Sequence, residues 1–549
     1  MDATDDKRAF PRFSAEELAS ITQVATPQKF ADGECLFRVG DAEVDMFVVL
    51  SGAIRVTNPT DGDREIIRHD GVGQFTGDID LLTGRPVVVD AHACGETTVL
   101  RVSNAKVRTL LSTIPRVSEK LMVAFQVRRQ LLEEAGPLGL RVIGDKTCRD
   151  TNVIREFLAK NFMPFTWLDT DTPAGRAAFE EAGSPKITPV VQCNGTQMLC
   201  PPLRDVAECA GVWRPCPTET VDIAIVGGGP AGLAAAVYGA SEGLKTIVLD
   251  RVGPGGQAGG SSRIENFIGF PAGLSGADLA TRGVLQMLKF GAMMLAPVKV
   301  EALEPGDANT PHGLKLDCGA TLRAHHVLIA TGATWRKLPA KNADRYERAG
   351  IYYACTATES RLHSGQEIAV VGGGNSAGQA AMYLAENCAR HVHLLVRGES
   401  LTDTMSQYLC GRISANKRIT LRPHVEIDEV IGDHEIASIK LKYNHDQDGP
   451  EGLDVGAIFV FVGAEPHTGW LPPEVARNEK GYIRTGADLT CRGLWPIKER
   501  DPCDLETSVP GVLALGDVRA GSTKRVGFAV GDGSMAITCV HRLRSYVGG

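Results

Sequence analysis

Two glycine-rich turns carry the strongest chemical signal in the 549-residue sequence. The first, Gly227-Gly-Gly229-Pro-Ala-Gly232, follows the apolar run 221–226 and opens an alanine-rich stretch that we expect to be helical. In such a turn Gly227 allows the tight bend, Gly229 admits a pyrophosphate against backbone N–H groups, and Gly232 packs helix on strand. The next predicted strand ends in Asp250, where an acid can accept ribose hydroxyls. This pattern predicts a dinucleotide site.

The second turn, Gly372-Gly-Gly374-Asn-Ser-Ala377, has the same surroundings, with alanine at the third position as a standard variant. No acid ends the strand that follows its helix, and Arg397 stands there instead. Because a cation suits a 2′-phosphate, the sequence favours NADPH over NADH, while Glu399 nearby argues for NADH. The alternative for Arg397 is a solvated surface residue.

Three segments of the chain differ in their apolar patterning. In residues 1–136 a capping box at Ser14-Ala-Glu-Glu17 starts a short helix, and short apolar runs separated by glycine turns then predict a small β-barrel or roll. Residues 137–217 contain a β-α-β unit with an antiparallel addition. Residues 218–549 alternate continuous apolar strands with alanine-rich helices. With two nucleotide turns, this last segment is predicted to form two doubly wound α/β domains.

Charge and composition exclude several classes of partner. The formal net charge is −8, and no block of lysine or arginine could track phosphates, which argues against nucleic acid. No apolar run is long enough for a membrane span and the acidic start has no signal-peptide core, so a cytoplasmic protein without a membrane partner is expected. The cysteines are too irregular for a disulfide framework, and we expect scattered, reduced thiols, including Cys193, Cys200 and Cys209. His391 and His393 lack a third ligand, so no metal site is predicted.

Residues 218–549 resemble the thioredoxin reductase family of pyridine nucleotide-disulfide oxidoreductases. The resemblance implies bound FAD and NADPH, with NADH as the alternative donor. It also implies an FAD domain in two parts, 218–335 and 463–549, around an NAD(P) domain at 336–462, and a homodimer formed through the flavin domains. The implied FAD contacts, with Asp517 at the ribityl chain, lie in Gly255-Gly-Gln257-Ala, Ile264-Glu-Asn266-Phe, the crossover run Val327 to Ala333 with Gly332, Gly511 to Asp517 with Gly516, and Lys524-Arg525-Val526.

The redox thiols of that family are incomplete in this sequence. The family has a Cys-x-x-Cys and an acid ahead of the second nucleotide turn, and the matching stretch is Ala354-Cys355-Thr-Ala-Thr358-Glu359. The resemblance makes Cys355 and Glu359 candidate catalytic residues. Thr358 replaces the cysteine expected to meet the flavin, and a hydroxyl cannot close a disulfide. Cys355 is therefore either a single reactive thiol or an ordinary, partly buried cysteine.

The middle segment resembles the thioredoxin/glutaredoxin fold, with Thr188-Pro189 as the candidate cis-proline. Its redox turn is Cys148-Arg-Asp-Thr151, again without a second cysteine. Because a helix N-terminus stabilises a thiolate, Cys148 is the third candidate catalytic residue. The alternative is a redox-inactive docking domain. A further hypothesis pairs Cys148 transiently with Cys355 after a large domain rotation.

The first segment resembles the cyclic-nucleotide-binding domain, with Gly77-Asp-Ile-Asp-Leu-Leu82 near the phosphate cassette. A buried phosphate needs a paired cation. Val87 stands where the family arginine is expected, and Arg85 is the alternative phosphate ligand. Loss of cyclic-nucleotide binding is therefore favoured over its retention.

These motifs together predict an FAD-dependent enzyme that takes hydride from NADPH and passes electrons to an unidentified acceptor, with a redox protein as one candidate. One alternative is a disulfide-free NADPH reductase of a ferredoxin-like protein. Another is a flavin-based redox or nucleotide sensor, which the two front segments would suit. A sensor would show slow reduction and no steady cycling.

Overall fold

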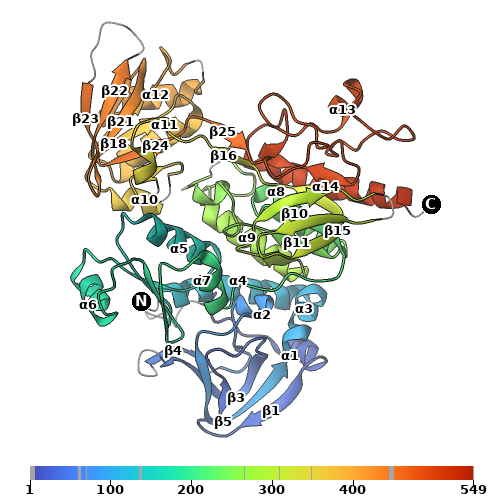
Figure 1. The fold of residues 1–549 in the computed structure, drawn as a ribbon. Coiled ribbons are helices and arrows are strands. Elements are labelled where there is room, and N and C mark those ends of the chain that lie inside the picture. The colour runs from blue at the N-terminus through green and yellow to red at the C-terminus, as the bar shows by residue number, and fades with distance from the viewer. Residues whose placement is uncertain are drawn as a thin grey trace.

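A computed structural model describes residues 7–59, 64–69, 71–134, 139–261, 263–264, 266–307, 310–347, 349–355, 357–402, 404–443 and 451–547. The predicted fold class is confirmed: a β-roll, a small α/β domain of the thioredoxin type and two doubly wound nucleotide domains follow one another (Figure 1). The predicted boundary between residues 136 and 137 lies outside the described residues, and the other boundaries stay predictions. Within the described ranges, no helix is both long and apolar enough to cross a membrane.

The front domain, residues 7–134, is an antiparallel roll closed by helices. Its elements are α1 (Ala15–Thr22), β1 (Thr26–Phe30), β2 (Cys35–Phe37), β3 (Met46–Asn58), β4 (Arg64–His69), α2 (Asp80–Thr83), β5 (Asp90–Val102), α3 (Asn104–Thr113) and α4 (Pro115–Glu134). The sheet order is β1-β5-β3-β4, with β2 paired to β5. The predicted capping box is formed: the Ser14 hydroxyl accepts from the Glu17 N–H at 3.3 Å, and the Glu17 carboxylate accepts from the Ser14 N–H at 2.6 Å.

The middle domain, residues 139–217, has the predicted β-α-β unit and antiparallel addition. Its elements are β6 (Arg141–Ile143), α5 (Arg149–Lys160), β7 (Thr166–Leu168), α6 (Pro173–Glu181), β8 (Val190–Cys193), β9 (Thr196–Leu199) and α7 (Leu203–Cys209). Strand β6 is parallel to β7 and antiparallel to β8, in the order β7-β6-β8-β9. The Thr188-Pro189 bond is cis, as the sequence predicts. Cys193 and Cys209 form a disulfide, so the prediction that they are unpaired thiols is wrong; α7 brings Cys209 back to the end of β8.

The first nucleotide domain combines two separate stretches of the chain. Its elements are β10 (Val221–Val226), α8 (Pro230–Ser241), β11 (Thr246–Leu249), η3 (Ala258–Gly260), α9 (Gly276–Lys289), β12 (Met293–Leu295), β13 (Val300–Glu304), β14 (His312–Leu316), β15 (Thr321–Ile329), α13 (Ala487–Cys491), β26 (Val512–Ala514), η5 (Gly516–Val518) and α14 (Val526–Val547). The sheet order is β12-β11-β10-β15-β14-β13, and β26 adds in parallel to β15. The C-terminal stretch therefore completes a sheet that begins about 290 residues earlier, at β10.

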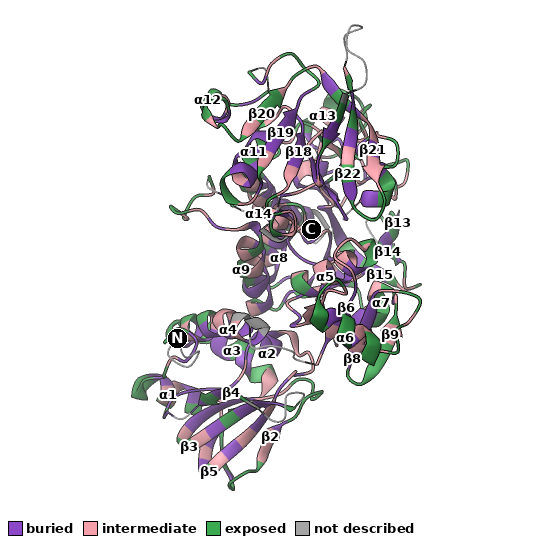
Figure 2. Ribbon diagram, turned by 90° about the vertical axis from the view of Figure 1, so that its left-hand side faces the viewer, coloured by how far each residue is buried: buried purple, intermediate pink, exposed green. Residues whose placement is uncertain are grey.

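The second nucleotide domain is inserted between those stretches and has its own parallel sheet. Its elements are β16 (Ala333–Trp335), η4 (Ala343–Tyr346), β17 (Ile351–Tyr352), α10 (Ala357–Leu362), β18 (Glu367–Val371), α11 (Asn375–Asn387), β19 (His391–Leu395), α12 (Gln407–Ala415), β20 (Ile419–Arg422), β21 (Val425–Gly432), β22 (Ile436–Tyr443), β23 (Glu451–Asp454), β24 (Ala457–Val460) and β25 (Ala464–Pro466). The order is β17-β24-β18-β19-β20, and β16 pairs with β25 where the chain enters and leaves. Strands β18 and β19 are buried along most of their length, as continuous apolar runs predict (Figure 2).

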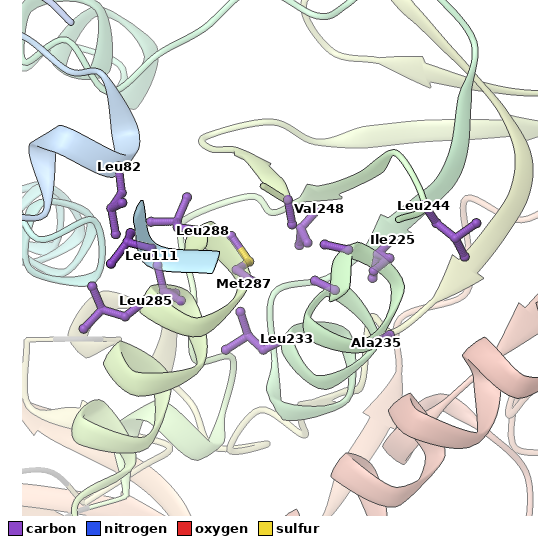
Figure 3. Packing of buried hydrophobic residues seen from close by; sticks show 14 of the residues in the cluster. Leu82, Leu111, Ile225, Leu233, Ala235, Leu244, Val248, Leu285, Met287 and Leu288 are labelled. Atoms are coloured by element: carbon purple, nitrogen blue, oxygen red, sulfur yellow. The ribbon is translucent and has the colours of Figure 1, made fainter. Parts of the chain in front are cut away.

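The front domain shares a hydrophobic core with the first nucleotide domain. Helices α2 and α3 contact α9, and Leu82 and Leu111 lie beside Leu285 and Leu288 (Figure 3). All four side chains are buried, so separating the domains would expose this apolar surface to water. The two domains are therefore one packed unit.

The middle domain contacts all three of its neighbours. Asn161, at the end of α5, accepts a 2.6 Å hydrogen bond on its carbonyl from the Arg85 guanidinium, and its amide donates to the Val252 carbonyl at 2.7 Å. On the other side, the Lys146 ammonium lies 3.3 Å from the Glu435 carboxylate of the second nucleotide domain. Arg85 thus ties two domains together, and the prediction that it could replace the missing phosphate ligand is not supported by this geometry.

Replacing Asn161 by alanine should loosen the middle domain from the first nucleotide domain. The buried amide makes two hydrogen bonds, to Phe157 and to Val252, and their loss should cost about 1–3 kcal/mol of local stability. Faster amide hydrogen exchange in α5 and α7 would measure this loss of local stability. Asn387→Ala is the control, because Asn387 makes the same helical bond on the surface, to Tyr383, without a second domain. Equal exchange in both variants would contradict the proposed interdomain contact.

Candidate functional site

The first glycine turn has the close backbone approaches that the sequence predicts. Gly227 has φ +112°, and a β-carbon there would lie 2.4 Å from the Ala330 carbonyl oxygen. A β-carbon on Gly232 would lie 1.9 Å from the Gly227 oxygen, so α8 packs directly on the turn. Gly229 is the N-cap of α8. The turn therefore joins β10 to the N-terminus of α8 with no side chain between them.

A second glycine stretch lies over this turn. The Gly255 N–H donates to the Gly228 carbonyl at 2.8 Å, and a β-carbon on Gly256 would lie 2.9 Å from the Gly229 Cα. Asp250 fixes the arrangement: its carboxylate accepts from the Gly228 N–H at 2.8 Å. It also accepts from the N–H groups of Val252 and Gly253, both at 2.9 Å. Asp250 therefore holds the loop onto the turn, a role that the predicted ribose contact does not include.

This bare backbone fits the pyrophosphate of a dinucleotide such as FAD. Positions 228, 229, 255 and 256 carry no side chain, and the N-terminus of the twelve-residue α8 opens between them. Unpaired N–H groups and the helix dipole attract phosphate at such a terminus. Any β-carbon within this cradle would take up space that the phosphates need.

The crossover and the closing motif approach the same turn. The Gln257 amide donates to the Ala333 carbonyl at 2.8 Å, next to Gly332, which has φ +64°. A β-carbon on Gly516 would lie 3.0 Å from the Ala231 side chain in α8. Asp517 follows in η5, half-buried, and this burial raises the pKa of its carboxyl, with a smaller upward effect from Asp532 and an opposing one from Lys524.

Asp532 is a positioning residue that lies in the Gly531-Asp-Gly533 stretch of the closing motif but is not among the predicted site residues. Its buried carboxylate accepts from the Gly516 N–H at 2.9 Å and lies 3.2 Å from the Arg519 guanidinium. It thereby fixes the closing motif against α14. Its place between Gly531 and Gly533 was the available signal, because a β-carbon on Gly533 would lie 2.5 Å from the Ala231 carbonyl.

Three of the predicted FAD residues have looser surroundings. Asn266 is exposed in a bend after Ile264, Arg525 is exposed just before α14, and Val526 is the half-buried first residue of that helix. Their predicted contacts with the cofactor stay predictions.

The second glycine turn repeats the geometry of the first. Gly372 has φ +138°, and a β-carbon there would lie 2.5 Å from the Phe461 carbonyl oxygen. Gly374 is the N-cap of α11, and Ala377 is buried in its first turn. Arg397 follows β19 with an exposed guanidinium, 3.9 Å from the Glu426 carboxylate. The arginine is thus at the predicted end of the strand, with an acid within its reach.

Cys355 lies in the core of the second nucleotide domain. It is 8% exposed and belongs to the same buried cluster as Tyr352 and Ala377. This burial strongly raises the pKa of its thiol, and the negative charges of Glu359 and of a Cys388 thiolate add to the effect. Cys355 is therefore held as a neutral thiol at physiological pH.

The middle domain brings Cys148 near this region without joining the two thiols. Cys148 is the half-exposed N-cap of α5. Arg155 of the same helix interacts electrostatically with Glu359 and Tyr352, and α5 lies beside α10 (Figure 1). The domains of Cys148 and Cys355 are thus already neighbours, whereas the sequence-based hypothesis requires a large rotation to bring them together.

Comparison with known proteins identifies the enzymatic part of the chain. The family model for pyridine nucleotide-disulphide oxidoreductase matches residues 221–533, more than half of the chain. The chain belongs to that family. A second model, for the cyclic nucleotide-binding domain, matches residues 27–113. This oxidoreductase uses FAD and NAD(P)H, as the two glycine turns predict.

Similar proteins match the nucleotide domains. The F component of alkyl hydroperoxide reductase from Staphylococcus aureus (strain MSSA476) is 31% identical over 320 residues, 58% of either chain, so the chain spans little more than half of that relative. The 34.2 kDa protein in the rubredoxin operon of Clostridium pasteurianum is 30% identical over 331 residues, 60% of this chain and 98% of its own. The thioredoxin reductase structure from T. acidophilum has a TM-score of 0.52 and 26% identity, covering 59% of this chain and 98% of that one. That from Lactococcus lactis has a TM-score of 0.51 and 27% identity, covering 60% and 99%.

The residues of the two turns set what the oxidoreductase can do. Bound FAD would supply the redox chemistry, as the acceptor of hydride from NAD(P)H. Gly228, Gly229 and Gly256 would leave room for the FAD pyrophosphate, and Asp250 holds the loop that would cover it. Gly374 is the N-cap of α11, whose N-terminus would receive the pyrophosphate of the nicotinamide nucleotide.

Gly229→Val and Gly374→Val should separate the two nucleotide sites. A β-carbon on Gly229 meets nothing closer than 3.9 Å, and one on Gly374 meets nothing within 4 Å, so neither β-carbon disturbs the protein itself. Gly229→Val should be purified with little FAD. Gly374→Val should keep its FAD while NADPH binding weakens by about tenfold or more. Flavin absorbance and NADPH titration would check both. A fully flavinated Gly229→Val protein would contradict the placement of the FAD site.

Proposed function

We propose that this chain is an NADPH oxidoreductase whose flavin gives its electrons directly to an acceptor, without a cysteine pair in the second nucleotide domain. The burial of Cys355, which keeps its thiol neutral, is the observation that carries the proposal. A thiolate is the form that attacks disulfides and flavins. Residue 358, at the start of α10, is a threonine, so the family's usual partner thiol is missing.

Cys388 is an alternative partner for Cys355, because it is the cysteine whose charge acts on the Cys355 thiol. It follows α11, is half-buried, and burial also raises the pKa of its thiol. Two neutral, largely buried thiols exchange slowly with an external disulfide, because few thiolates form and access is poor. A Cys355–Cys388 relay is therefore the weaker proposal, and the same experiment tests it.

Cys355→Ser and Cys388→Ser should each keep wild-type turnover of NADPH with a small electron acceptor such as ferricyanide. Neither variant should gain or lose the ability to reduce thioredoxin, which we expect to be negligible in the wild type. The measurement is steady-state NADPH oxidation by the FAD-loaded enzymes. Loss of acceptor reduction in Cys355→Ser, with FAD content unchanged, would contradict a direct transfer.

Arg397 supports the choice of NADPH as the electron donor. Its exposed guanidinium follows β19, where a 2′-phosphate can accept charge-assisted hydrogen bonds. The Glu426 carboxylate lies 3.9 Å from this guanidinium. Without the arginine, its negative charge would repel the 2′-phosphate of NADPH.

Arg397→Ala should therefore raise the KM for NADPH about tenfold and leave the KM for NADH nearly unchanged. Steady-state kinetics with both nucleotides measures the ratio. Arg412→Ala is the control, since Arg412 also pairs with an acid on the surface of this domain, Glu386. An unchanged NADPH/NADH ratio would leave Arg397 as a solvated surface residue.

The similar proteins suggest a class of electron acceptor and an oligomeric state for this chain. Thioredoxin reductases and a component of alkyl hydroperoxide reductase are the similar proteins, so a redox protein is the first acceptor class to screen, with ferredoxin-like proteins as the alternative. A homodimer through the flavin domains is the assembly proposed for the chain.

A sensor is the second candidate function, because the front domain shares a core with the flavin domain. The cavity beside Gly77 and Asp78 has a volume of about 50 Å³, whereas ligand pockets measure about 300–1,000 Å³. The buried Arg128 guanidinium borders it and lies 4.4 Å from the centre of the Phe75 ring. We infer that this domain does not hold a cyclic nucleotide in the present conformation. Helix α2, which overlaps the Gly77–Leu82 stretch, contacts α9, so a change of conformation at α2 would be felt by the first nucleotide domain.

A further inference from the structure

Cys200 lies beside the cis-proline of the middle domain. It directly follows β9, and its N–H donates to the Pro189 carbonyl at 2.7 Å, which continues the pairing of β8 with β9. By its sequence spacing alone Cys200 is one of several scattered thiols. Cys193 and Cys209 are already joined by a disulfide, so Cys200 is a free, half-exposed thiol at this place.

Pro189 in turn lies beside Gly144, four residues before Cys148. A β-carbon on Gly144, after β6, would lie 2.3 Å from the Thr151 hydroxyl and 3.1 Å from the Pro189 side chain. The end of β6, the first turn of α5 and the cis-proline are therefore in contact. Cys148 is the half-exposed N-cap of α5, a twelve-residue helix.

An acid in the first turn of α5 contacts Cys200. The Cys200 thiol donates to the Asp150 carboxylate, with the sulfur and oxygen 3.4 Å apart, and Asp150 lies two residues after Cys148. Partial burial, this hydrogen bond and the charges of Asp150 and of a Cys148 thiolate raise the pKa of Cys200. Cys200 thus stays protonated beside a carboxylate that can accept its proton, while Cys148 stands at the helix terminus.

We propose that Cys148 and Cys200 form a redox pair in which Cys148 is the nucleophile and Cys200 the resolving thiol, acting on low-molecular-weight or exposed protein disulfides. The Cys148 thiolate attacks one sulfur of the substrate disulfide, forms a mixed disulfide and releases the first thiolate. The Cys200 sulfur, losing its proton to Asp150, then attacks the Cys148 sulfur and releases the second. Two cysteine thiols are oxidised to one disulfide, and the substrate disulfide is reduced to two thiols.

The pair makes up for the missing second cysteine of the Cys148-Arg-Asp-Thr151 turn from another part of the fold. Thr151 is fully buried against Gly144, so its hydroxyl has no route to a substrate. Cys148, Asp150 and Cys200 all remain reachable from solvent. This proposal needs neither nucleotide site and is therefore independent of the proposed NADPH oxidoreductase function.

The test uses the full chain, reduced with dithiothreitol, freed of it and treated with glutathione disulfide. Trypsin cleaves after Lys146, Arg149, Lys186 and Arg204, which places Cys148 on one peptide and Cys200, together with Cys193, on another. Fragment ions that break the second peptide between Cys193 and Cys200 show which of its two cysteines is linked to Cys148. Mass spectrometry of the wild type should find these peptides linked by a disulfide. Cys200→Ser should instead accumulate glutathione on Cys148, several-fold above the wild type, because the mixed disulfide is not resolved. Cys491→Ser, which removes an exposed cysteine elsewhere, should behave as the wild type.

The absence of the linked peptides from the oxidised wild type would overturn the proposal without reference to any variant. Equal glutathione on Cys148 in the wild type and in Cys200→Ser would overturn the resolving role of Cys200. In the Cys148→Ser variant, Cys200 is the remaining thiol of the pair. If glutathione is added to Cys200 in this variant as fast as the wild type reacts with glutathione disulfide, the assignment of Cys148 as the nucleophile is overturned.

Discussion

The bare N-terminus of α8 is the constraint on which the enzymatic part of the structure depends. Gly227 and Gly232 let the helix pack onto the turn. Gly533 lets α14 cross the same helix, because a β-carbon at this position would lie only 2.5 Å from the Ala231 carbonyl oxygen. That crossing places Gly516 and Asp517 at the turn, with Asp532 fixing their backbone. Two stretches far apart in the sequence therefore meet at the turn where we propose that the FAD pyrophosphate binds.

Access to solvent divides the cysteines into two groups with different chemistry. Cys355 is buried in an apolar cluster that favours its neutral form, so the thiol that the family resemblance marks as catalytic is poorly suited to exchange. Cys148 and Cys200 are half-exposed, and a helix terminus and a carboxylate lie beside them. Both of these half-exposed thiols lie in the middle domain, which contacts the flavin domain through Asn161 and the nicotinamide domain through Lys146.

Local patterns predicted the turns, and long-range contacts had to come from the structure. The glycine spacing and the capping box at Ser14 depend on neighbouring residues and were predictable. The cis-proline at Pro189 was predicted from the resemblance to the thioredoxin fold, and the second cis bond, Ala296-Pro297, was not predicted. The Cys193–Cys209 disulfide, the contact of Cys200 with Asp150 and the bond of Arg85 to Asn161 join residues whose separation no periodicity encodes. The sequence shows that Arg85 carries a positive charge, which suggests a phosphate ligand. It does not show that the guanidinium faces the middle domain and bonds to Asn161.

The redox state of Cys355 during turnover tests the account most directly. The FAD-loaded chain would be sampled before and after anaerobic reduction by NADPH, quenched in acid, denatured and alkylated, and the alkylation of the Cys355 peptide compared by mass spectrometry. We predict equal and complete alkylation in both samples, since Cys355 is a thiol before the flavin is reduced and takes no part in the electron transfer. Alkylation that arises only after NADPH is added would show that Cys355 cycles through a disulfide and would contradict the account.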